Sequence, residues 1–369
     1  MTFPFDALSA CRAELEEEAS INDAQGTFPA DGLRRVRELG GLSAVLPTTL
    51  GGYGFGEGCQ GAIGLLHLLR LTGEGNLSLG RIVEGHVNAI RLIACYGTPE
   101  QLARAAADIH DGALFGVWVT QGTAPVRMEQ TGDSIILRGE KIFASGVRQV
   151  TRALITANTA DDATRMILVP LDTEHNAAPC LDGITGMRGA GAGRYDFTGT
   201  MVLSDALIGQ SGDYLRQPEF SAGAWRGMAV ALGGIDRLVT LLREQLCARS
   251  RAENPSQQAR IGTALIAAET ARLWTCKAAL IAAGTDDHEA GDVAATVNLA
   301  RLAVERAGLE VIELAQRGLG LSAFVKTNVV ERLIRDLSTY LRQPAPDETL
   351  LEAAEWFTRR NLPQMERIW

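Results

Sequence analysis

The sequence predicts a mainly helical, multidomain α+β protein with a small β domain in the middle of the chain. Short runs of Val, Ile and aromatic residues, separated by Gly-Asp and Arg-Gly turn signals, gather between residues 112 and 204. Long stretches with apolar residues at helical spacing fill the rest of the chain. A length of 369 residues allows two or three domains. We therefore expect an N-terminal helical domain (1–111), a central β domain (112–210) and a C-terminal four-helix bundle (211–369).

The composition and charge of the chain argue against several classes of protein. A net charge of −9, without a basic patch interleaved with aromatic residues, argues against nucleic-acid binding. No apolar run reaches membrane-spanning length, and the charged, amphipathic residues 5–20 do not resemble a signal peptide. The six cysteines lack C-x-x-C spacing, and the five histidines lack metal-ligand spacing. We expect a cytoplasmic protein with free thiols and no metal site.

The first domain is expected to be helical. Candidate helices cover 7–19, 33–39, 61–71 and 82–96. The last two carry apolar residues on several faces, which indicates burial in a bundle. The Gly-Thr-Pro-Glu sequence at 97–100 predicts a helix break and a new helix capped by Thr98. His86 lies inside a predicted helix, and a structural histidine with satisfied partners is the favoured interpretation over a catalytic one.

The central domain is expected to contain strands joined by short turns. Strand-like runs cover 114–120, 134–137, 140–146, 153–157, 165–170 and 195–203. A glycine-rich stretch at 187–193 suggests a phosphate loop at first sight. A G-x-G-x-x-G fingerprint needs a preceding strand and a following helix, however, and the next run alternates like a strand. We interpret the stretch as a connection.

Two of the predicted strand ends carry residues that suit a flat, electron-poor ring. Trp118-Val119-Thr120 closes one run, and Phe143-Ala144-Ser145 lies at the end of another. Such a ring needs an aromatic or apolar wall on one face and a few fixed hydroxyls at its polar edge. Strand ends hold these groups rigidly. The alternative is that Trp118 and Phe143 are ordinary sheet core, and the residues alone leave both interpretations open.

From Glu219 onward the chain is expected to be helical. Candidate helices cover 232–248, 257–280, 293–314 and 326–341. Their stripes of Leu, Ala, Ile and Val predict an antiparallel bundle. The apolar faces of 229–248 and 293–316 exceed what one core needs. We therefore expect a homodimer or homotetramer built on the bundle.

The paired strand ends resemble two motifs of the acyl-CoA dehydrogenases, a family of FAD enzymes. In that family an apolar strand ends in a Thr-Glu-Pro-Gly-type loop, and a later strand ends Gly-x-Lys-x-Trp-Ile-Thr-Asn. Here the corresponding pieces are residues 118–121 and 139–146. Phe143 stands where the family has its flavin-stacking Trp, and Ser145 stands where it has a hydroxyl that bonds the flavin. The resemblance covers about residues 30 to 343 and implies the acyl-CoA dehydrogenase-like fold.

The resemblance also implies FAD as the cofactor. The implied cofactor-binding residues are Trp118, Val119, Thr120, Phe143, Ser145 and Arg249. Arg249 ends the first bundle helix and resembles the family arginine that reaches across a dimer interface to the FAD pyrophosphate. A solvated charge at a helix end is the alternative for this residue.

The chain departs from the family where the family keeps its catalytic base. Residues 331–336 match the family's helix, and a Glu that removes the α-proton of the thioester follows it in many members. Here that place is Pro344. Other members carry the base just before an Arg that resembles Arg226, and here that residue is Trp225. Asp347 and Glu348 lie nearby, but the catalytic residues stay unassigned.

The resemblance implies an FAD-dependent oxidoreductase that oxidises an acyl thioester, such as an acyl-CoA, and passes electrons to a protein partner. One alternative is a flavin-dependent monooxygenase of the same fold, in which reduced flavin and oxygen need no such base. Another is a non-catalytic homologue that binds a partner or an acyl chain.

Overall fold

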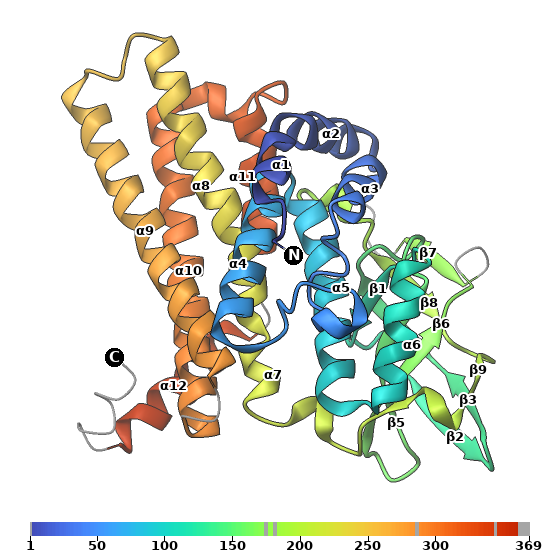
Figure 1. Cartoon of the computed structure of the whole chain (residues 1–369). Helices are drawn as coiled ribbons and strands as arrows, with labels where there is room; N and C mark the ends of the chain where they lie inside the picture. The colour runs from blue at the N-terminus through green and yellow to red at the C-terminus, as the bar shows by residue number, and fades with distance from the viewer. Residues whose placement is uncertain (1, 173–175, 180–182, 285–287, 343–344, 361–369) are drawn as a thin grey trace.

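The computed structural model describes residues 2–172, 176–179, 183–284, 288–342 and 345–360. The long helices of the C-terminal bundle lie on one side of the molecule and the β strands on the other (Figure 1). Helices α4 (Gly58–Gly75) and α5 (Leu77–Tyr96) lie between them, with α4 packed along the bundle and α5 against the sheet. The predicted order of helical, β and helical parts is confirmed.

The predicted N-terminal helices are present with different bounds, and the predicted stretch 7–19 is divided into two helices at Cys11. The others are α1 (Phe5–Ala10), α2 (Arg12–Gln25), α3 (Ala30–Glu38), η1 (Thr48–Leu50) and α6 (Pro99–His110). The Thr98 side chain accepts the Gln101 N–H, and the Gln101 side chain accepts the Thr98 N–H. Together with Pro99 in the first turn, this capping box confirms the predicted restart of the helix.

The strands form two small sheets between Phe115 and Ile208. The strands are β1 (Phe115–Trp118), β2 (Arg127–Thr131), β3 (Ser134–Arg138), β4 (Glu140–Ala144), β5 (Arg152–Asn158), β6 (Thr164–Pro170), β7 (Ala177–Pro179), β8 (Gly193–Asp196), β9 (Met201–Leu203) and β10 (Leu207–Ile208). The larger sheet has the order β10-β6-β5-β2-β3-β9, with β1 paired in parallel to β5. The smaller sheet is β4-β8-β7. The sequence did not reveal β2, because its residues Arg-Met-Glu-Gln-Thr are nearly all polar.

The C-terminal part is helical over its described length. Its helices are α7 (Glu219–Ala222), α8 (Ala224–Ala248), α9 (Pro255–Ala283), α10 (Ala290–Leu319), α11 (Val329–Tyr340) and α12 (Pro346–Thr358). Short 3₁₀ turns lie in the β domain, at η2 (Arg188–Ala190) and η3 (Ser204–Ala206), and in the C-terminal part, at η4 (Asp213–Leu215) and η6 (Gly320–Phe324). Helices α8, α9 and α10 pack side by side as the long members of the bundle (Figure 1).

Helices α4 and α8 meet backbone to backbone because glycine occupies the crossing on both sides. A Cβ at Gly73 would lie 2.2 Å from the carbonyl oxygen of Val230, and a Cβ at Gly233 would lie 2.1 Å from that of Arg70. No side chain fits at such distances, so the close approach requires glycine at both places. This crossing joins the N-terminal helices to the bundle.

The apolar faces of 229–248 and 293–316, on which the expectation of an oligomer was based, are not available for an interface. Most apolar residues of 229–248 and 293–316 are buried inside this chain, because α8 and α10 pack against α4, α9 and each other. The exposed apolar stripe lies on α9 instead, where Ile266 is 70% and Leu273 is 63% exposed, with Leu280 seven residues further on at 41%. A spacing of seven keeps the three side chains on one face. Homo-oligomerisation stays a prediction, now placed on α9.

Within the described residues, no helix combines the length and apolarity that a membrane span requires. No group of three or more His, Cys, Asp or Glu side chains in that part of the chain is arranged to hold a metal ion. Five of the cysteines are free thiols, and Cys180 lies outside the described residues.

Candidate functional site

The ends of β1 and β4 lie side by side, as the paired motifs predicted. The Ile142 N–H donates to the Thr120 carbonyl at 3.1 Å, and Gln121 forms a bridge with Lys141. These bonds bring Thr120 and the Phe143–Ser145 segment to one end of the β domain. Thr120 is exposed and Ser145 is half-buried, so both hydroxyls are accessible.

Phe143 is held in an unfavourable backbone conformation. Its φ is +53°, a left-handed value that is rare for an aromatic residue, and the pairing of β4 with β8 shifts register between Lys141 and Ala144. The bulge leaves the ring 47% exposed. Strain of this kind persists at binding and catalytic sites, because a functional need maintains it against the intrinsic preference of the residue. Phe143 is therefore not ordinary sheet core.

Trp118, in contrast, belongs to the core of the β domain. It is 3% exposed, and its ring packs on Tyr195 with centroids 5.8 Å apart. Its indole Nε1–H donates to the Ser145 carbonyl at 3.2 Å. The core alternative left open for Trp118 is therefore correct for its ring, which positions Ser145 rather than forming an open wall. Val119 next to it is half-buried.

A buried lysine that the sequence analysis missed fastens the two strand ends together. Lys141 Nζ donates to the Val119 carbonyl at 3.0 Å and to Thr156 Oγ1 at 2.9 Å. Its side chain is fully buried, and burial lowers the pKa of its amine to about 7. A lysine inside the apolar Lys-Ile-Phe-Ala run was the available signal, because a lysine there must find polar partners.

His86 is structural, as predicted. Its Nδ1 accepts the Phe115 N–H at 3.1 Å, and its Nε2 lies 2.8 Å from the Leu42 carbonyl. The imidazole is therefore neutral, with the proton on Nε2, and burial lowers its pKa to about 4. It joins α5 to the first residue of β1.

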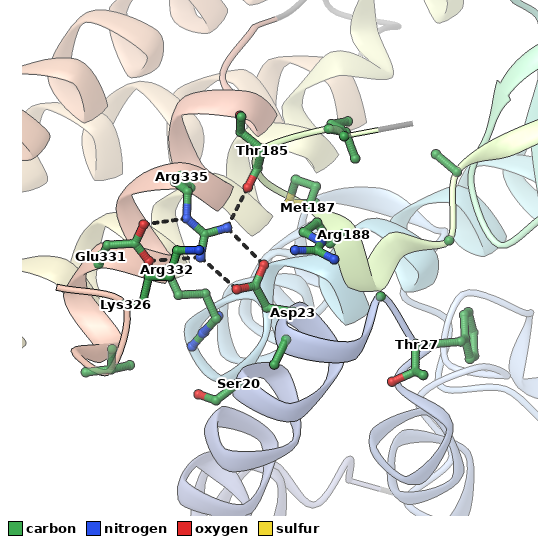
Figure 2. A pocket seen from close by; sticks show the side chains of 18 of the residues that line it. Ser20, Asp23, Thr27, Thr185, Met187, Arg188, Lys326, Glu331, Arg332 and Arg335 are labelled. Carbon is green, nitrogen blue, oxygen red and sulfur yellow. Dashed lines mark hydrogen bonds and ion pairs between the residues drawn. The ribbon is translucent and has the colours of Figure 1, made fainter. Parts of the chain in front are cut away.

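A cavity of about 1180 Å³ lies between the β domain and the bundle, bounded by α2, residues 146–149 and 183–192, and the region around the start of α11. Figure 2 shows Arg335, one of its lining residues, bonded to Asp23, Glu331 and the Thr185 carbonyl. Arg335 holds Asp23 through two bonds of 2.9 and 2.7 Å, so it clamps α11 to α2.

The glycine-rich connection crosses α11 directly beside this clamp. Asp336 accepts the Met187 N–H at 2.6 Å, and a Cβ at Gly186 would lie 2.1 Å from the Arg335 carbonyl. The connection therefore needs glycine where it touches the helix. The cavity wall begins at Gly146, directly after Ser145, but Thr120, Phe143 and Ser145 are not among its lining residues.

A second polar group fills the space where α5, α8 and the end of α11 converge. Glu84 is 7% exposed and accepts bonds from Arg81, from Asn88 at 2.6 Å and from Tyr340 at 3.4 Å. Arg226 Nε donates to Asn88, and burial lowers the pKa of Arg226 to about 10. The sequence did not reveal this network, because Arg226 and Tyr340 come from α8 and α11, far along the chain from the three members on α5.

The two places where the related family keeps its base offer none among the described residues. Trp225 is 4% exposed beside Arg226, and Pro344 lies outside the described residues. Asp347 and Glu348 are exposed in the first turn of α12. At Trp225, therefore, the structure supplies no carboxylate, as the sequence predicted.

Arg249 stays with the bundle in this chain. It follows the last residue of α8, and its guanidinium donates to the Leu319 carbonyl at 3.4 Å and to the Gln245 side chain at 3.1 Å. The five other predicted cofactor residues lie in the β domain. Whether Arg249 serves a neighbouring protomer stays a prediction.

Comparison with known proteins supports the same fold. No protein-family model matches the chain. A 3-sulfinopropanoyl-CoA desulfinase from Variovorax paradoxus is 26% identical over 359 residues, which cover 89% of this chain and 86% of the relative. The bovine (Bos taurus) mitochondrial short-chain specific acyl-CoA dehydrogenase is 24% identical over 361 residues, which cover 88% and 82%.

Solved structures agree over almost the whole chain. Methanesulfinate monooxygenase from Pseudomonas fluorescens superposes with a TM-score of 0.84 at 19% identity, covering 98% of each chain. Butyryl-CoA dehydrogenase from Megasphaera elsdenii superposes with a TM-score of 0.83 at 15% identity, covering 97% of this chain and 99% of its own. The chain is similar over most of its length to acyl-CoA dehydrogenases and related enzymes, and it has the acyl-CoA dehydrogenase fold.

Proposed function

We propose that the protein is an FAD-dependent oxidoreductase with its flavin against the strand ends of the β domain. Phe143 carries this proposal, because a strained and half-exposed aromatic ring at a bulge needs a functional explanation. Two hydroxyls on neighbouring strand ends, Thr120 and Ser145, complete a wall and a polar edge for a flat ring.

The residues present fit a flavin. Phe143 supplies an apolar face, and Thr120 and Ser145 supply hydroxyls that donate or accept. Lys141 and Trp118 fix the backbones that carry these hydroxyls, through their bonds to Val119 and Ser145. A bound flavin supplies the acceptor for a hydride or for single electrons. The chain's own contribution is to hold that ring in one orientation.

The proposed substrate class is an acyl thioester or a related carbonyl compound, with electrons passing to a protein partner. Oxidation between the α and β carbons needs a group that takes the α-proton, and a carboxylate serves best. Glu84 is a buried carboxylate near the start of α8, but Arg81, Asn88 and Tyr340 already occupy its oxygens. We propose that this chemistry is slow with ordinary acyl-CoAs.

A second candidate is a flavin-dependent monooxygenase, in which oxygen is the electron acceptor. One observation favours it. Trp225 stands at one of the two positions where the family keeps its base, and its buried indole can donate a hydrogen bond but cannot accept a proton. Oxygen activation by reduced flavin does not require a base at that position. The similarity in fold to a methanesulfinate monooxygenase agrees with this candidate.

One set of measurements on the purified protein separates these candidates. The visible spectrum tests for flavin, and chromatography of the released cofactor distinguishes FAD from FMN. Anaerobic bleaching by an acyl-CoA supports the dehydrogenase. Oxygen consumption that depends on a substrate and a flavin reductase supports the monooxygenase. A colourless protein that takes up no added FAD would reject both enzymes in favour of a non-catalytic homologue.

A further inference from the structure

We propose that the cavity between α2 and α11 is an anion site, separate from the flavin face, that binds the phosphate group of a small metabolite. The cavity is large enough for a nucleotide-sized molecule, at about 1180 Å³. Three features of the cavity point to an anion: the charges of its wall, a buried arginine with an unsatisfied donor, and three cations that form no ion pair with another described residue.

The wall carries more positive than negative charge, although the chain as a whole is acidic. Its basic residues are Arg148, Arg188, Lys326, Arg332 and Arg335, and its acidic residues are Asp23 and Glu331. Both carboxylates are bonded to Arg335 (Figure 2). The remaining four cations form no ion pair with either wall carboxylate, although Arg188 and Arg332 lie near enough to Asp23 to help lower its pKa. A cleft lined by one sign of charge concentrates ligands of the opposite sign.

Arg332 is the buried member of this group. It is 4% exposed, and its guanidinium forms one described ion pair, from Nη1 to Asp336 at 3.1 Å. Its Nε–H is buried and has no hydrogen-bond partner among the described residues. An unsatisfied donor on a buried charged group is costly, so a partner beyond the protein chain is expected there. An oxyanion in the cavity would stabilise this guanidinium.

The other cations come from separate segments around the opening. Arg148 follows β4, Arg188 lies in η2 and Lys326 precedes α11; each is exposed and has no ion pair or hydrogen bond with another described residue. The Arg188 guanidinium lies 3.7 Å from the place a Cβ would take at Gly26, so it reaches across to the end of α2.

Hydroxyls complete the wall, and phosphate suits it better than carboxylate does. The hydroxyl-bearing lining residues are Ser20, Thr27, Thr185 and Thr327. A phosphate offers acceptor oxygens in several directions and a double charge, which matches cations placed around a cavity. A single carboxylate accepts from one plane and would leave some of these donors without a partner.

Lys326 provides a direct test, because the chain has only three lysines. Lys141 is fully buried and Lys277 is half-buried, whereas Lys326 is exposed. The rate of lysine acetylation would be followed by mass spectrometry, with inorganic phosphate, pyrophosphate or ADP present, against sodium chloride at equal ionic strength. We expect acetylation of Lys326 to slow about tenfold when the ligand reaches ten times its Kd, with Lys277 unchanged. Slowing with ADP but not with the inorganic ions would mean that the ligand is a nucleotide.

Calorimetry with the same probes would identify the residues. Arg148→Gln with Arg188→Gln should weaken binding at least about tenfold, because each substitution removes a charge-assisted contact. Arg127→Gln with Arg138→Gln is the matched control, since both arginines are exposed in the β domain outside the cavity. The site would be rejected if the Arg148/Arg188 and Arg127/Arg138 double variants bound the probes with equal affinity. It would also be rejected if no probe slowed the acetylation of Lys326.

The measurements are repeated on protein saturated with FAD, so that the cavity and the flavin are tested separately. Protection by pyrophosphate or ADP that persists in the FAD-loaded protein supports two sites. If FAD alone protects Lys326 and prevents the phosphate probes from binding, the cavity is part of the flavin's own site and the proposal is wrong. A protein that takes up no flavin but still binds pyrophosphate would keep the anion site and reject the proposed function.

Discussion

The indole Nε1–H of Trp118 donates to the backbone carbonyl of Ser145 at 3.2 Å, across the gap between β1 and β4. The two residues lie 27 positions apart in the chain: Trp118 ends β1 of the larger sheet, and Ser145 directly follows β4 of the smaller one. This bond, together with the two bonds of Lys141, makes the strand ends one rigid unit. A ring that rests on this unit meets groups whose positions are fixed before it binds, which lowers the entropic cost of binding.

The first prediction concerns the two hydroxyls of this unit. Thr120→Ala combined with Ser145→Ala should lower the ratio of flavin to protein after purification, because both side chains are accessible and neither replacement disturbs the backbone bonds. The ratio is measured from the visible spectrum. Thr131→Ala with Ser134→Ala, at the β2–β3 turn, is the matched control. Equal flavin content in both double variants would remove Thr120 and Ser145 from the site.

The second prediction separates stability from binding at Phe143. Phe143→Gly should leave the free energy of unfolding within about 1 kcal/mol of the wild type, because a left-handed φ costs an L-residue roughly 1–2 kcal/mol and glycine removes that cost. Flavin retention should fall, since the wall is lost. Urea unfolding and the visible spectrum measure the two effects.

Phe115→Ala is the control for Phe143, because Phe115 is fully buried and its truncation should cost about 3–5 kcal/mol. A loss of that size in Phe143→Gly would mean that the ring contributes to the core and that its strain has another origin.

The third prediction is a pH dependence from His86. Burial lowers the pKa of its imidazole to about 4, whereas the unfolded chain binds the proton near 6.5. Between these values the unfolded state binds more protons, so stability should fall as the pH drops from about 6.5 to about 4. The loss should be on the order of 3 kcal/mol, and less in His86→Gln. Urea unfolding at pH 7, 5 and 4 compares the slopes; identical slopes in both proteins would contradict the assignment.

The fourth prediction concerns assembly. Ile266, Leu273 and Leu280 form an exposed apolar stripe on α9, and a stable homodimer or homotetramer would cover it. Sedimentation at micromolar concentration should give a mass above the 39.4 kDa of one chain. Ile266→Glu with Leu273→Glu should shift the protein toward the monomer. Arg260→Glu, on the same helix, is the charge control. A monodisperse wild-type monomer would contradict the prediction.

The fifth prediction concerns catalysis with ordinary acyl-CoAs. Straight-chain acyl-CoAs should bleach the flavin about 10²- to 10⁴-fold more slowly than in a relative that has a base, which is the typical contribution of general-base catalysis. Anaerobic mixing followed by flavin absorbance measures the rate. Rapid bleaching that survives both Asp347→Asn and Glu348→Gln would show that another group takes the proton. Glu84→Gln would then be the next variant, because Glu84 is a buried carboxylate that Asn88 links to Arg226 at the start of α8.

The sequence by itself determined the order of helical, β and helical parts and the pairing of the two strand-end motifs. Periodicity and turn residues are local signals, and they were strong in the long helices, in the Thr98 cap and in most strands. The strand β2 was missed because its polar residues carry no such signal; its position follows from pairing with β3 and β5.

Only the tertiary structure decided which side chains are core and which are available. Trp118 and Phe143 looked equivalent in sequence, but a bulge and a positive φ expose one, while packing on Tyr195 buries the other. The network around Glu84 and the cavity around Arg335 join residues more than a hundred positions apart. Such contacts depend on how elements pack against one another. No local pattern encodes that packing, because many different residues satisfy the same helical or strand periodicity.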